Sequence, residues 1–514
     1  MKKSLGLLVT LLMLLTLSGC SGSSSSTSSP SEKASPSVQP SNTSTAKPNV
    51  VTIKYVIPGT QPKSYQEVID AVNKKLLDDG VGVQIEEQFI DWSVWNQKLN
   101  LMLSTGEDFD MFQVMNDQVS LSNYIARGAA QDIGKALDQY GANIKKVIPQ
   151  DVFNAVSKDG KIYGIPAYWY ESAQDGGFTT NNYLFKKYGI STQFNTVQDL
   201  LDASVKLYNA APNPKPIFPV NFTSTSSDVL NRSFDSYPFD VRDGVAMITK
   251  DGKVNSWIES NEFKQESDIM HQMYQKKLLN PDLLTMKSDQ GQKAVKEGNW
   301  PFMFGTYGNA ITDIQKTFPD IQKTDLTYQR FNPEKGYYRF VNAKNLNVIA
   351  SNSKHPAEAV KFINWLYANQ DNYDLFMYGI EGKTYKKVGD HQMEPMVDPA
   401  TQNWLTPNSD WMIGNLHFIR TSSEALPSAL TIYNQVPDAK SFISSGFFFD
   451  SSPVKTEFAN VKATLASDVI PIFSGVLDYN THIKQAVDKL KAAGLDKVIA
   501  EYQKQLNAYM ATNK

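Results

Sequence analysis

A strict alternation of strand and helix patterns between residues 51 and 114 restricts the fold more than any other feature of the chain. Apolar alternation predicts a strand over 51–57, and further strands are expected over 83–90 and 109–114. Apolar side chains three and four residues apart predict helices over 65–76 and 95–103 between them. Strands separated by helices in this way pair in parallel through right-handed crossovers. We therefore expect an α/β fold, in which ligands bind in loops beyond the carboxyl ends of the strands.

The residue inventory excludes several kinds of chemistry. One cysteine cannot form an internal disulfide or a cysteine-rich metal centre, and five scattered histidines add no ligand cluster. The formal charge of −3, from 50 basic and 53 acidic residues, leaves no basic excess to bind nucleic-acid phosphates. We therefore expect no metal, no cofactor and no nucleic-acid partner.

The cysteine follows a segment that is typical of an export signal. Two lysines precede an apolar run over 5–17 that is too short for a permanent transmembrane helix. The residues Leu17-Ser18-Gly19-Cys20 resemble the bacterial lipoprotein signal, which implies a signal peptide over 1–19 and a lipid on Cys20. An ordinary signal peptide with a coincidental cysteine is the alternative. Serine, threonine and proline make up 19 of the 28 residues over 21–48, so residues 20–48 are expected to be a disordered tether.

Five segments resemble one protein family in their order along the chain. They are KDGKIYGIP over 158–166, GFTTNNYLFKKYG over 177–189, TVQDLL over 196–201, KEGNWPFMFG over 296–305 and HPAEAVKFINWL over 355–366. Together they are similar to the extracellular solute-binding proteins of the carbohydrate type, which serve bacterial ABC importers. The segments 378–385, 452–457 and 492–506 resemble the larger LplA-type lipoprotein branch of the family.

The resemblance implies a periplasmic-binding-protein-like fold, with two α/β lobes, a hinge and an interlobe cleft. We expect lobe 1 over 49–175 with 350–405, and lobe 2 over 176–349 with 406–514. Crossings between the lobes are expected near 168–180 and 345–351, and the last boundary is the least defined. The resemblance also implies a monomer that is anchored by its lipid on the outer face of the cell membrane and works with permease subunits.

Loop residues supply the candidate binding site. A sugar ring has an apolar face and a rim of hydroxyls, so a binding cleft needs flat aromatic surfaces together with amides or carboxylates. The segment 168–171 lies where the family places its hinge and cleft floor, and the other candidates follow expected strands or lie in expected loops. The candidates are Trp92, Asn116, Tyr168, Trp169, Tyr170, Glu171, Tyr307, Trp404 and Trp411. Packing of these rings inside the lobes or the hinge is the alternative for each.

Catalytic motifs are missing from the sequence. It contains no HExxH, no GxSxG, no cysteine pair and no glycine-rich dinucleotide turn. The residues Gly382-Lys383-Thr384 imitate the end of a P-loop, but Met377 stands where that loop needs glycine, so a turn after a helix is expected. We predict a binding protein that captures an oligosaccharide and is not an enzyme. A binding protein for a peptide or another solute, and a secreted carbohydrate-active enzyme with two distant carboxylates, remain the alternatives.

Overall fold

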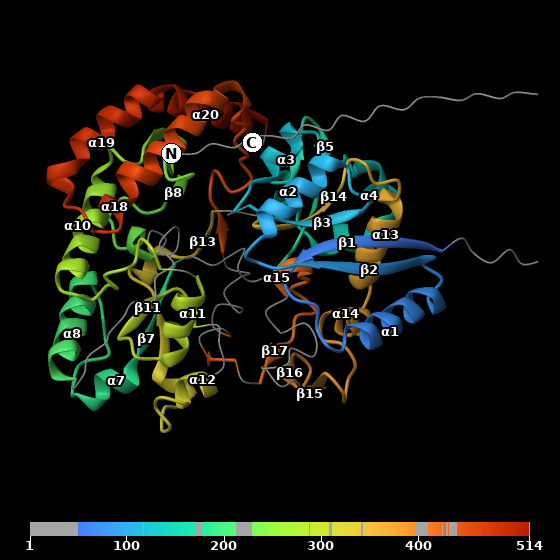
Figure 1. Ribbon diagram of the computed structural model, residues 1–514, viewed down its shortest axis with the longest axis horizontal. Helices are drawn as coiled ribbons and strands as arrows, with labels where there is room; N and C mark the ends of the chain where they lie inside the picture. The colour runs from blue at the N-terminus through green and yellow to red at the C-terminus, as the bar shows by residue number, and fades with distance from the viewer. Residues whose placement is uncertain are drawn as a thin grey trace, which may run out of the picture. The chain divides into compact units, whose positions relative to one another are not determined.

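The computed structural model describes residues 50–116, 118–169, 176–211, 229–286, 288–307, 311–340, 343–396, 410–423, 425–427, 430 and 439–512. Two large hydrophobic cores organise these residues. Figure 1 traces the helices and strands that surround them. We call lobe 1 the part around the first core, whose buried residues come from 53–169 and 343–419. We call lobe 2 the part around the second core, whose buried residues come from 178–331 and 442–506.

Lobe 1 is built on a five-stranded sheet with the order β2-β1-β3-β14-β6. Strand β1 pairs in parallel with β2 and β3, which confirms the parallel start predicted from the alternating pattern. Strand β14 pairs antiparallel with both β3 and β6, so the chain returns from lobe 2 to complete the sheet. The bounds are β1 Val51–Pro58, β2 Val83–Ile90, β3 Met111–Met115, β6 Ile165–Pro166 and β14 Asn345–Ile349.

Helix α1, Tyr65–Asp78, buries the face that its apolar spacing predicts. It also covers the open edge of β2, because the Asn73 amide donates to the Ile85 carbonyl at 3.0 Å and accepts from the Ile85 N–H at 2.7 Å. An edge strand satisfied in this way is protected from pairing with another chain. The other helices of lobe 1 are α2 Trp95–Thr105, α3 Leu121–Ala126, α4 Gly134–Tyr140, α5 Ala142–Val147, α6 Gln150–Asn154, α13 Pro356–Leu366, α14 Gln370–Met377 and α15 Asp410–Ile413.

Short strands complete lobe 1. The predicted turn at 158–161 is a hairpin in which Asp159 and Gly160 have positive φ, at 52° and 73°. Gly382-Lys383-Thr384 lies in a turn after α14, as expected, and Gly382 has a φ of 81°. The strands are β4 Ser157–Lys158, β5 Lys161–Ile162, β15 Tyr385–Lys387, β16 Gln392–Pro395 and β17 Thr421–Ser422.

Lobe 1 takes in residues that the sequence assigned to lobe 2. Buried residues from Ala343 to Ile349 and from Met412 to Ile419 belong to the first core. The reason is the antiparallel pairing of β14 with β3, which inserts this strand into the lobe 1 sheet, and the packing of α15 beside β14. Local sequence patterns do not indicate which strands pair when they are distant in the chain.

Lobe 2 contains two three-stranded sheets, with the orders β11-β7-β12 and β10-β9-β8. The central strand β7, Phe178–Asn181, occupies the start of the segment GFTTNNYLFKKYG. It ends because the Asn181 side chain accepts from the Leu184 N–H and caps a helix that begins at Asn182. The other strands are β8 Phe239–Arg242, β9 Ala246–Thr249, β10 Val254–Ser256, β11 Phe302–Phe304 and β12 Leu326–Gln329, and a separate pair comprises β13 Tyr338–Arg339 and β18 Lys440–Ser441.

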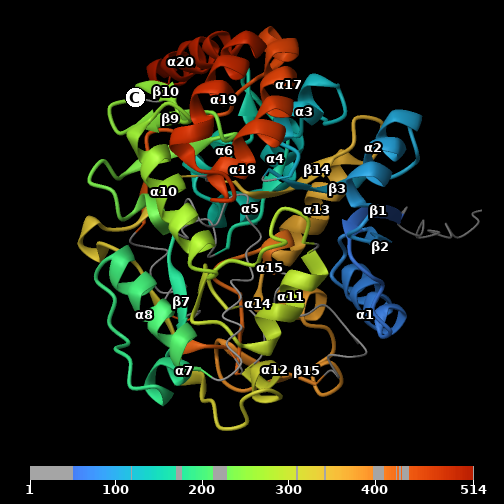
Figure 2. The ribbon, with the colours of Figure 1, turned by 60° about the vertical axis from the view of Figure 1, so that its left-hand side comes forward.

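The helices of lobe 2 follow sequence signals closely. Thr196 and Asp199 form a capping box at the start of the helix expected from TVQDLL. The last two helices of the chain meet at Gly494, a left-handed cap with a φ of 106°. The α-helices are α7 Asn182–Lys187, α8 Val197–Ala210, α10 Asn261–Gln275, α11 Ser288–Glu297, α12 Ile311–Gln315, α17 Lys455–Thr464, α18 Ile470–Phe473, α19 Tyr479–Ala493 and α20 Leu495–Thr512. Short turns of other helix types are η2 Lys323–Asp325, η3 Pro333–Lys335, η6 Ser452–Val454 and the π-helix η7 Leu465–Val469. Figure 2 shows α17–α20 gathered beside α10.

Two side-chain contacts connect lobe 1 with the chain at 441–450. The Lys158 ammonium lies 2.7 Å from the Asp450 carboxylate, and the Ser441 hydroxyl donates to Asp151 at 2.9 Å. Asp450 is itself fixed by Gln505, which bonds to both its N–H and its carbonyl at 2.8 Å. No described helix has the combination of length and apolar character needed to cross a bilayer.

Candidate functional site

Trp92 and Trp411 lie side by side beyond the carboxyl end of β2. Their ring centroids are 5.8 Å apart and their planes meet at 41°. Trp92 is 49% exposed in the loop after β2, and Trp411 is half-buried on α15. The sequence predicted both as ligand residues, and the fold brings them together from positions more than 300 residues apart. The pair presents aromatic surface to solvent at the edge where α/β sheets bind ligands.

The backbone on both sides of Trp411 is fixed by buried polar groups. Asp410 accepts hydrogen bonds from the Tyr373 hydroxyl at 2.7 Å and the Tyr378 hydroxyl at 3.0 Å. The Met412 carbonyl accepts from Asn347 Nδ2 at 3.0 Å and from Gln113 Nε2 at 3.4 Å.

Strand β1 supports the two amides that hold Met412. The Tyr55 hydroxyl lies 2.7 Å from Gln113 Oε1 and 2.5 Å from Asn347 Oδ1. Three strands of the sheet therefore contribute to the position of Trp411.

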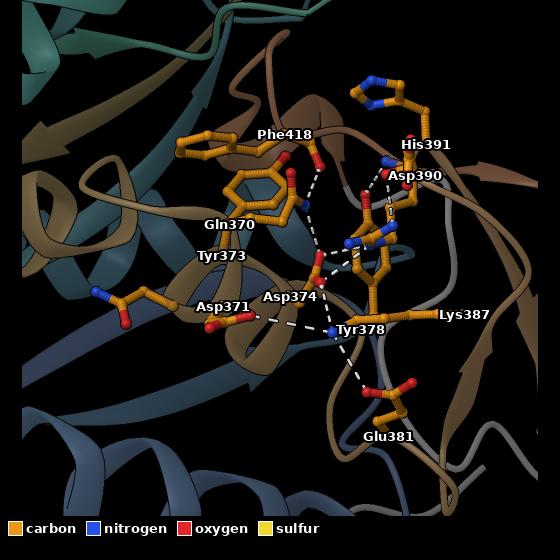
Figure 3. Close-up of polar contacts among 12 residues, drawn as sticks. Gln370, Asp371, Tyr373, Asp374, Tyr378, Glu381, Lys387, Asp390, His391 and Phe418 are labelled. Atoms are coloured by element: carbon orange, nitrogen blue, oxygen red, sulfur yellow. Dashed lines mark hydrogen bonds and ion pairs between the residues drawn. The ribbon is translucent and has the colours of Figure 1, made fainter.

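An ion pair secures the chain that follows Trp411 (Figure 3). The Arg420 Nε donates to both carboxylate oxygens of Asp374 at 2.9 Å, and both side chains are nearly inaccessible to solvent. Arg420 Nη1 also donates to the carbonyls of Gly389 and Asp390, at 3.2 and 2.8 Å. Lys387 lies 3.7 Å from Asp374 and 3.2 Å from Glu381. This network connects α14 and the β15–β16 hairpin to the segment that carries Trp411.

The carboxyl group of Asp410 gives lobe 1 a pH-dependent stability. Burial raises its pKa from 3.8 to about 7, although the hydrogen bonds from Tyr373 and Tyr378 act to lower it. An acid with a raised pKa binds more protons in the folded state, so its contribution is present below about pH 4 and is lost as the pH rises through about 7. The loss is up to about 1.4 kcal/mol for each pH unit in this window. Asp410→Asn removes the titration and keeps an oxygen that accepts from the tyrosines.

We define ΔTm as the unfolding temperature of Asp410→Asn minus that of the wild type. We therefore expect ΔTm to be larger at pH 8 than at pH 5. Thermal unfolding followed by calorimetry at several pH values measures this difference. Glu87 provides a comparison, because burial raises its pKa to about 8 and its contribution remains in the Asp410 variant. A variant that keeps the full pH slope of the wild type contradicts the assignment.

Tyr168 and Trp169 follow β6 and pack beside the end of α15. Tyr168 donates its backbone N–H to the Gly414 carbonyl at 2.8 Å, and it forms a parallel bridge with Asn415. Both rings are largely buried, with 9% and 7% of their surface exposed, and they belong to the first core. Gly414 is required here, since a Cβ would lie 2.6 Å from the Trp169 Cβ. The contact of Tyr168 and Trp169 with ligand remains a prediction.

Asn116 and Tyr307 use their side chains within the protein. Asn116 Nδ2 donates to the Ala343 carbonyl at 2.5 Å, and its Oδ1 accepts from the Leu121 N–H at 2.8 Å. This amide therefore connects the turn after β3 to the start of the returning strand. Tyr307 is 2% exposed against Trp300, and burial raises the pKa of its hydroxyl. Both remain predictions as ligand residues. Tyr170, Glu171, Trp404 and Cys20 lie outside the described residues.

A polar cavity of about 490 Å³ lies along β1 and β2. Its charged residues include Lys54, Glu86 and Asp91, and Lys54 is paired with Asp108 at 2.6 Å. Asp91 directly precedes Trp92, so the cavity adjoins the loop of the aromatic pair. The lining residues are Lys54, Gly59, Thr60, Gln61, Glu86, Glu87, Gln88, Phe89 and Asp91. Among the described residues no group of three or more histidine, cysteine or acidic side chains could hold a metal ion.

Four buried amides near the site were not predicted from the sequence. Gln113, Asn345, Asn347 and Asn415 are each at most 4% exposed. The available signal was an amide inside an otherwise apolar strand, as in Met-Phe-Gln-Val-Met over 111–115. Buried polar groups of this kind are held by hydrogen bonds or serve a function.

Family comparison identifies the class of protein that this fold and site define. Residues 58–373 match the bacterial extracellular solute-binding protein family, and the match covers more than half of the 514 residues. The chain belongs to this family. Residues 443–511 match a second family, described as a domain of unknown function, DUF3502. The LplA-type branch remains a prediction.

Particular relatives come from Streptococcus pneumoniae. The chain is 25% identical over 473 residues to a carbohydrate ABC transporter substrate-binding protein of serotype 4, covering 89% of this chain and 90% of that protein. The crystal structure of the N-glycan transport solute-binding protein NgtS superposes with a TM-score of 0.73 at 21% identity, covering 90% of this chain and 100% of that chain. FusA in complex with kestose has a TM-score of 0.61 at 17% identity, covering 90% and 100%. These structures confirm the predicted two-lobed α/β fold.

Proposed function

We propose that this solute-binding protein captures an oligosaccharide and delivers it to the permease of a bacterial ABC importer. The observation that carries the proposal is the Trp92–Trp411 pair, whose rings lie 5.8 Å apart beyond the carboxyl end of β2. Stacked or tilted aromatic rings match the apolar faces of successive sugar units. The acidic and amide groups along the adjoining cavity match sugar hydroxyls.

The relatives support a saccharide over other solutes. The serotype 4 protein is named as a carbohydrate transporter component, and NgtS has been solved in complex with Man1GlcNAc and Man5GlcNAc. We extend the ligand class, but no particular glycan, to this chain.

Ligand capture works through a change in lobe populations. A ligand that contacts both lobes stabilises the closed arrangement by no more than its differential affinity for that arrangement. A shift from mostly open to mostly closed needs about 5.5 kcal/mol of such difference. Stacking on two aromatic rings of lobe 1, together with hydrogen bonds from both lobes, can supply a free-energy difference of this size. The permease then distinguishes the closed form.

The tether part of the proposal rests on the sequence alone. We propose cleavage before Cys20, lipid attachment to its thiol, and a monomer held on the outer face of the cell membrane. Mass spectrometry of the native protein extracted from membranes should find a lipid on Cys20. A free thiol at that position, or cleavage elsewhere, contradicts lipidation and leaves the binding proposal intact.

A ligand screen tests the binding function against its alternatives. For the body over 49–514, we expect neutral oligosaccharides to raise the unfolding temperature, because a ligand at 100 times its Kd adds about 2.7 kcal/mol to the stability of the folded state. Peptides and charged amino acids are expected to have no effect. A peptide that stabilises the protein while every saccharide fails would establish the peptide alternative. Unchanged saccharide after prolonged incubation, analysed by chromatography, is the result expected of a protein without hydrolytic activity.

A further inference from the structure

Asn345, the first residue of β14, has a buried amide that makes no hydrogen bond through its oxygen. The residue is 4% exposed, and its Oδ1 has no partner. Its backbone is well satisfied, because its carbonyl accepts from the Ala167 N–H at 2.9 Å and the residue pairs with Met115 across the sheet. The backbone therefore fixes the point from which the side chain projects, while the side-chain oxygen stays unused.

The amide of Asn345 lies on the sheet face that carries α15. Side chains two residues apart on a strand share a face, so Asn345 lies on the same side as Asn347. Asn347 donates to the Met412 carbonyl at 3.0 Å, which places α15 over this face. Asn345 is one step of about 6.6 Å further toward the carboxyl end of β3. That direction is the ligand edge of the sheet, where Trp92 and Trp411 meet.

Asn415 provides an independent observation of the same kind. It is fully buried, and its Nδ2 has no partner, whereas its Oδ1 accepts from the His417 N–H at 3.1 Å. The oxygen is therefore committed and only the donor is unused. Asn415 forms a bridge with Tyr168, and Asn345 accepts from the N–H of Ala167, the residue directly before Tyr168. The backbones of both asparagines therefore bond to adjacent residues.

One unused acceptor, on Asn345, and one unused donor, on Asn415, are therefore held by backbone that bonds to the adjacent residues Ala167 and Tyr168. A buried polar group without a partner lowers stability, and an apolar side chain of the same shape would not. Sugar hydroxyls both donate and accept, so such a pair matches them, whereas a peptide terminus or a carboxylate would need a full opposite charge.

We propose that Asn345 and Asn415 are the hydroxyl-binding groups of the saccharide site and recognise a neutral sugar unit next to the Trp92–Trp411 pair. This assignment rests on the proposed oligosaccharide function. It names ligand residues that are separate from the aromatic residues predicted from the sequence.

Asn345→Leu separates a ligand role from a structural role through the unfolding temperature without ligand. A ligand role predicts that this temperature stays the same or rises, and a structural role predicts that it falls. We expect the unfolding temperature without ligand to stay the same or rise, since an unused polar oxygen is replaced by an apolar group of similar volume. We expect the Kd for the saccharide found in the screen to increase at least tenfold, measured by isothermal titration calorimetry. If that variant does not fold, Asn345→Val makes the same comparison with a smaller side chain suited to a strand.

Ser267→Ala is the matched control. Ser267 is also fully buried with an unpartnered hydroxyl, but it lies on helix α10 of lobe 2. Its replacement is expected to leave both the Kd and the unfolding temperature near the wild-type values. Asn415→Asp completes the set, because it keeps an acceptor for His417 and replaces the Nδ2 donor by a carboxylate oxygen; we expect an increase in Kd of at least fivefold, and the unfolding temperature reports any cost of the buried carboxyl group.

Each outcome has a distinct meaning. If the wild type binds a saccharide and Asn345→Leu binds it with equal affinity, the assignment of Asn345 is wrong while the proposed function stands. If the variant loses both affinity and stability in proportion, Asn345 has a structural role and the assignment is overturned. If the wild type binds no saccharide and binds another solute, the proposed function fails first, and the site assignment fails with it.

Discussion

Arg420→Ala is expected to lower the free energy of unfolding of lobe 1 by about 3–5 kcal/mol. The replacement leaves the Asp374 carboxylate, which is 2% exposed, without the guanidinium that donates to both of its oxygens. Breaking a buried ion pair by removing one partner costs this much because the remaining charge is desolvated and uncompensated. Lys387, which is 3.7 Å away and 33% exposed, and the Gln370 amide, which donates to Asp374 at 2.7 Å, compensate the remaining charge only in part. Urea denaturation followed by circular dichroism measures the loss.

A surface pair in the same lobe supplies the control for Arg420. Lys74 and Asp78 are 76% and 60% exposed on α1, so Lys74→Ala should change the stability by less than about 0.5 kcal/mol. Arg420→Lys should lie between the two, because an ammonium keeps the charge but loses the fork that bonds to Asp374, Gly389 and Asp390. A loss below about 1 kcal/mol for Arg420→Ala would show that the pair does not hold this part of the lobe.

Trp411→Ala is expected to weaken saccharide binding by about 2 kcal/mol, or roughly 30-fold in Kd. The indole is the half-buried member of the pair, and α15 is fixed by Asp410 and Met412, so the ring is held in place before ligand arrives. Because the ring is already ordered, little side-chain entropy is lost when ligand stacks on it, and truncation to alanine removes this stacking surface. Titration calorimetry with the saccharide from the screen gives the change, and an unaltered Kd would show that Trp411 does not contact the ligand.

A double-mutant cycle with Trp92→Ala tests whether the two rings act as one surface. Because their centroids are 5.8 Å apart, the losses should not add, and the coupling should exceed about 0.5 kcal/mol. Leu101→Ala is the control, since Leu101 is an apolar side chain of lobe 1 that is 60% exposed on α2. Its replacement should leave the Kd unchanged. Additive losses for the tryptophans would place them in separate subsites.

Local sequence signals predicted the parts of the fold that local physics determines. The alternating patterns over 51–114 predicted three parallel strands and two helices. The position of β14 between β3 and β6 could not be predicted in this way, because pairing between distant segments has no local period. The lobe boundaries near residues 345 and 410 shifted for the same reason.

The candidate site shows the same division. Trp92 and Trp411 were noticed because they were expected in loops, Trp92 directly after a strand. Trp411 lies on α15 instead, and nothing in the sequence indicated that the two rings are neighbours. Asn116 was also noticed for its place after a strand, and its amide bonds to Ala343 and Leu121. Asn345 and Asn415 were missed, since an amide at a strand start or after a short helix resembles any other polar residue until its partners are known.

The return of the chain into lobe 1 has a consequence for folding. Gln113 meets the Met412 carbonyl across 299 residues of sequence, and Tyr55 meets Asn347 across 292. Contacts of such separation close very long loops, and proteins dominated by them fold slowly because the loop entropy is lost before the contacts form. The part of the sheet that carries α15 is therefore expected to become native late, because it can form only after residues 178–331, which separate β6 from β14, allow the chain to return to lobe 1. Ligand-binding competence should appear in refolding experiments later than helix content.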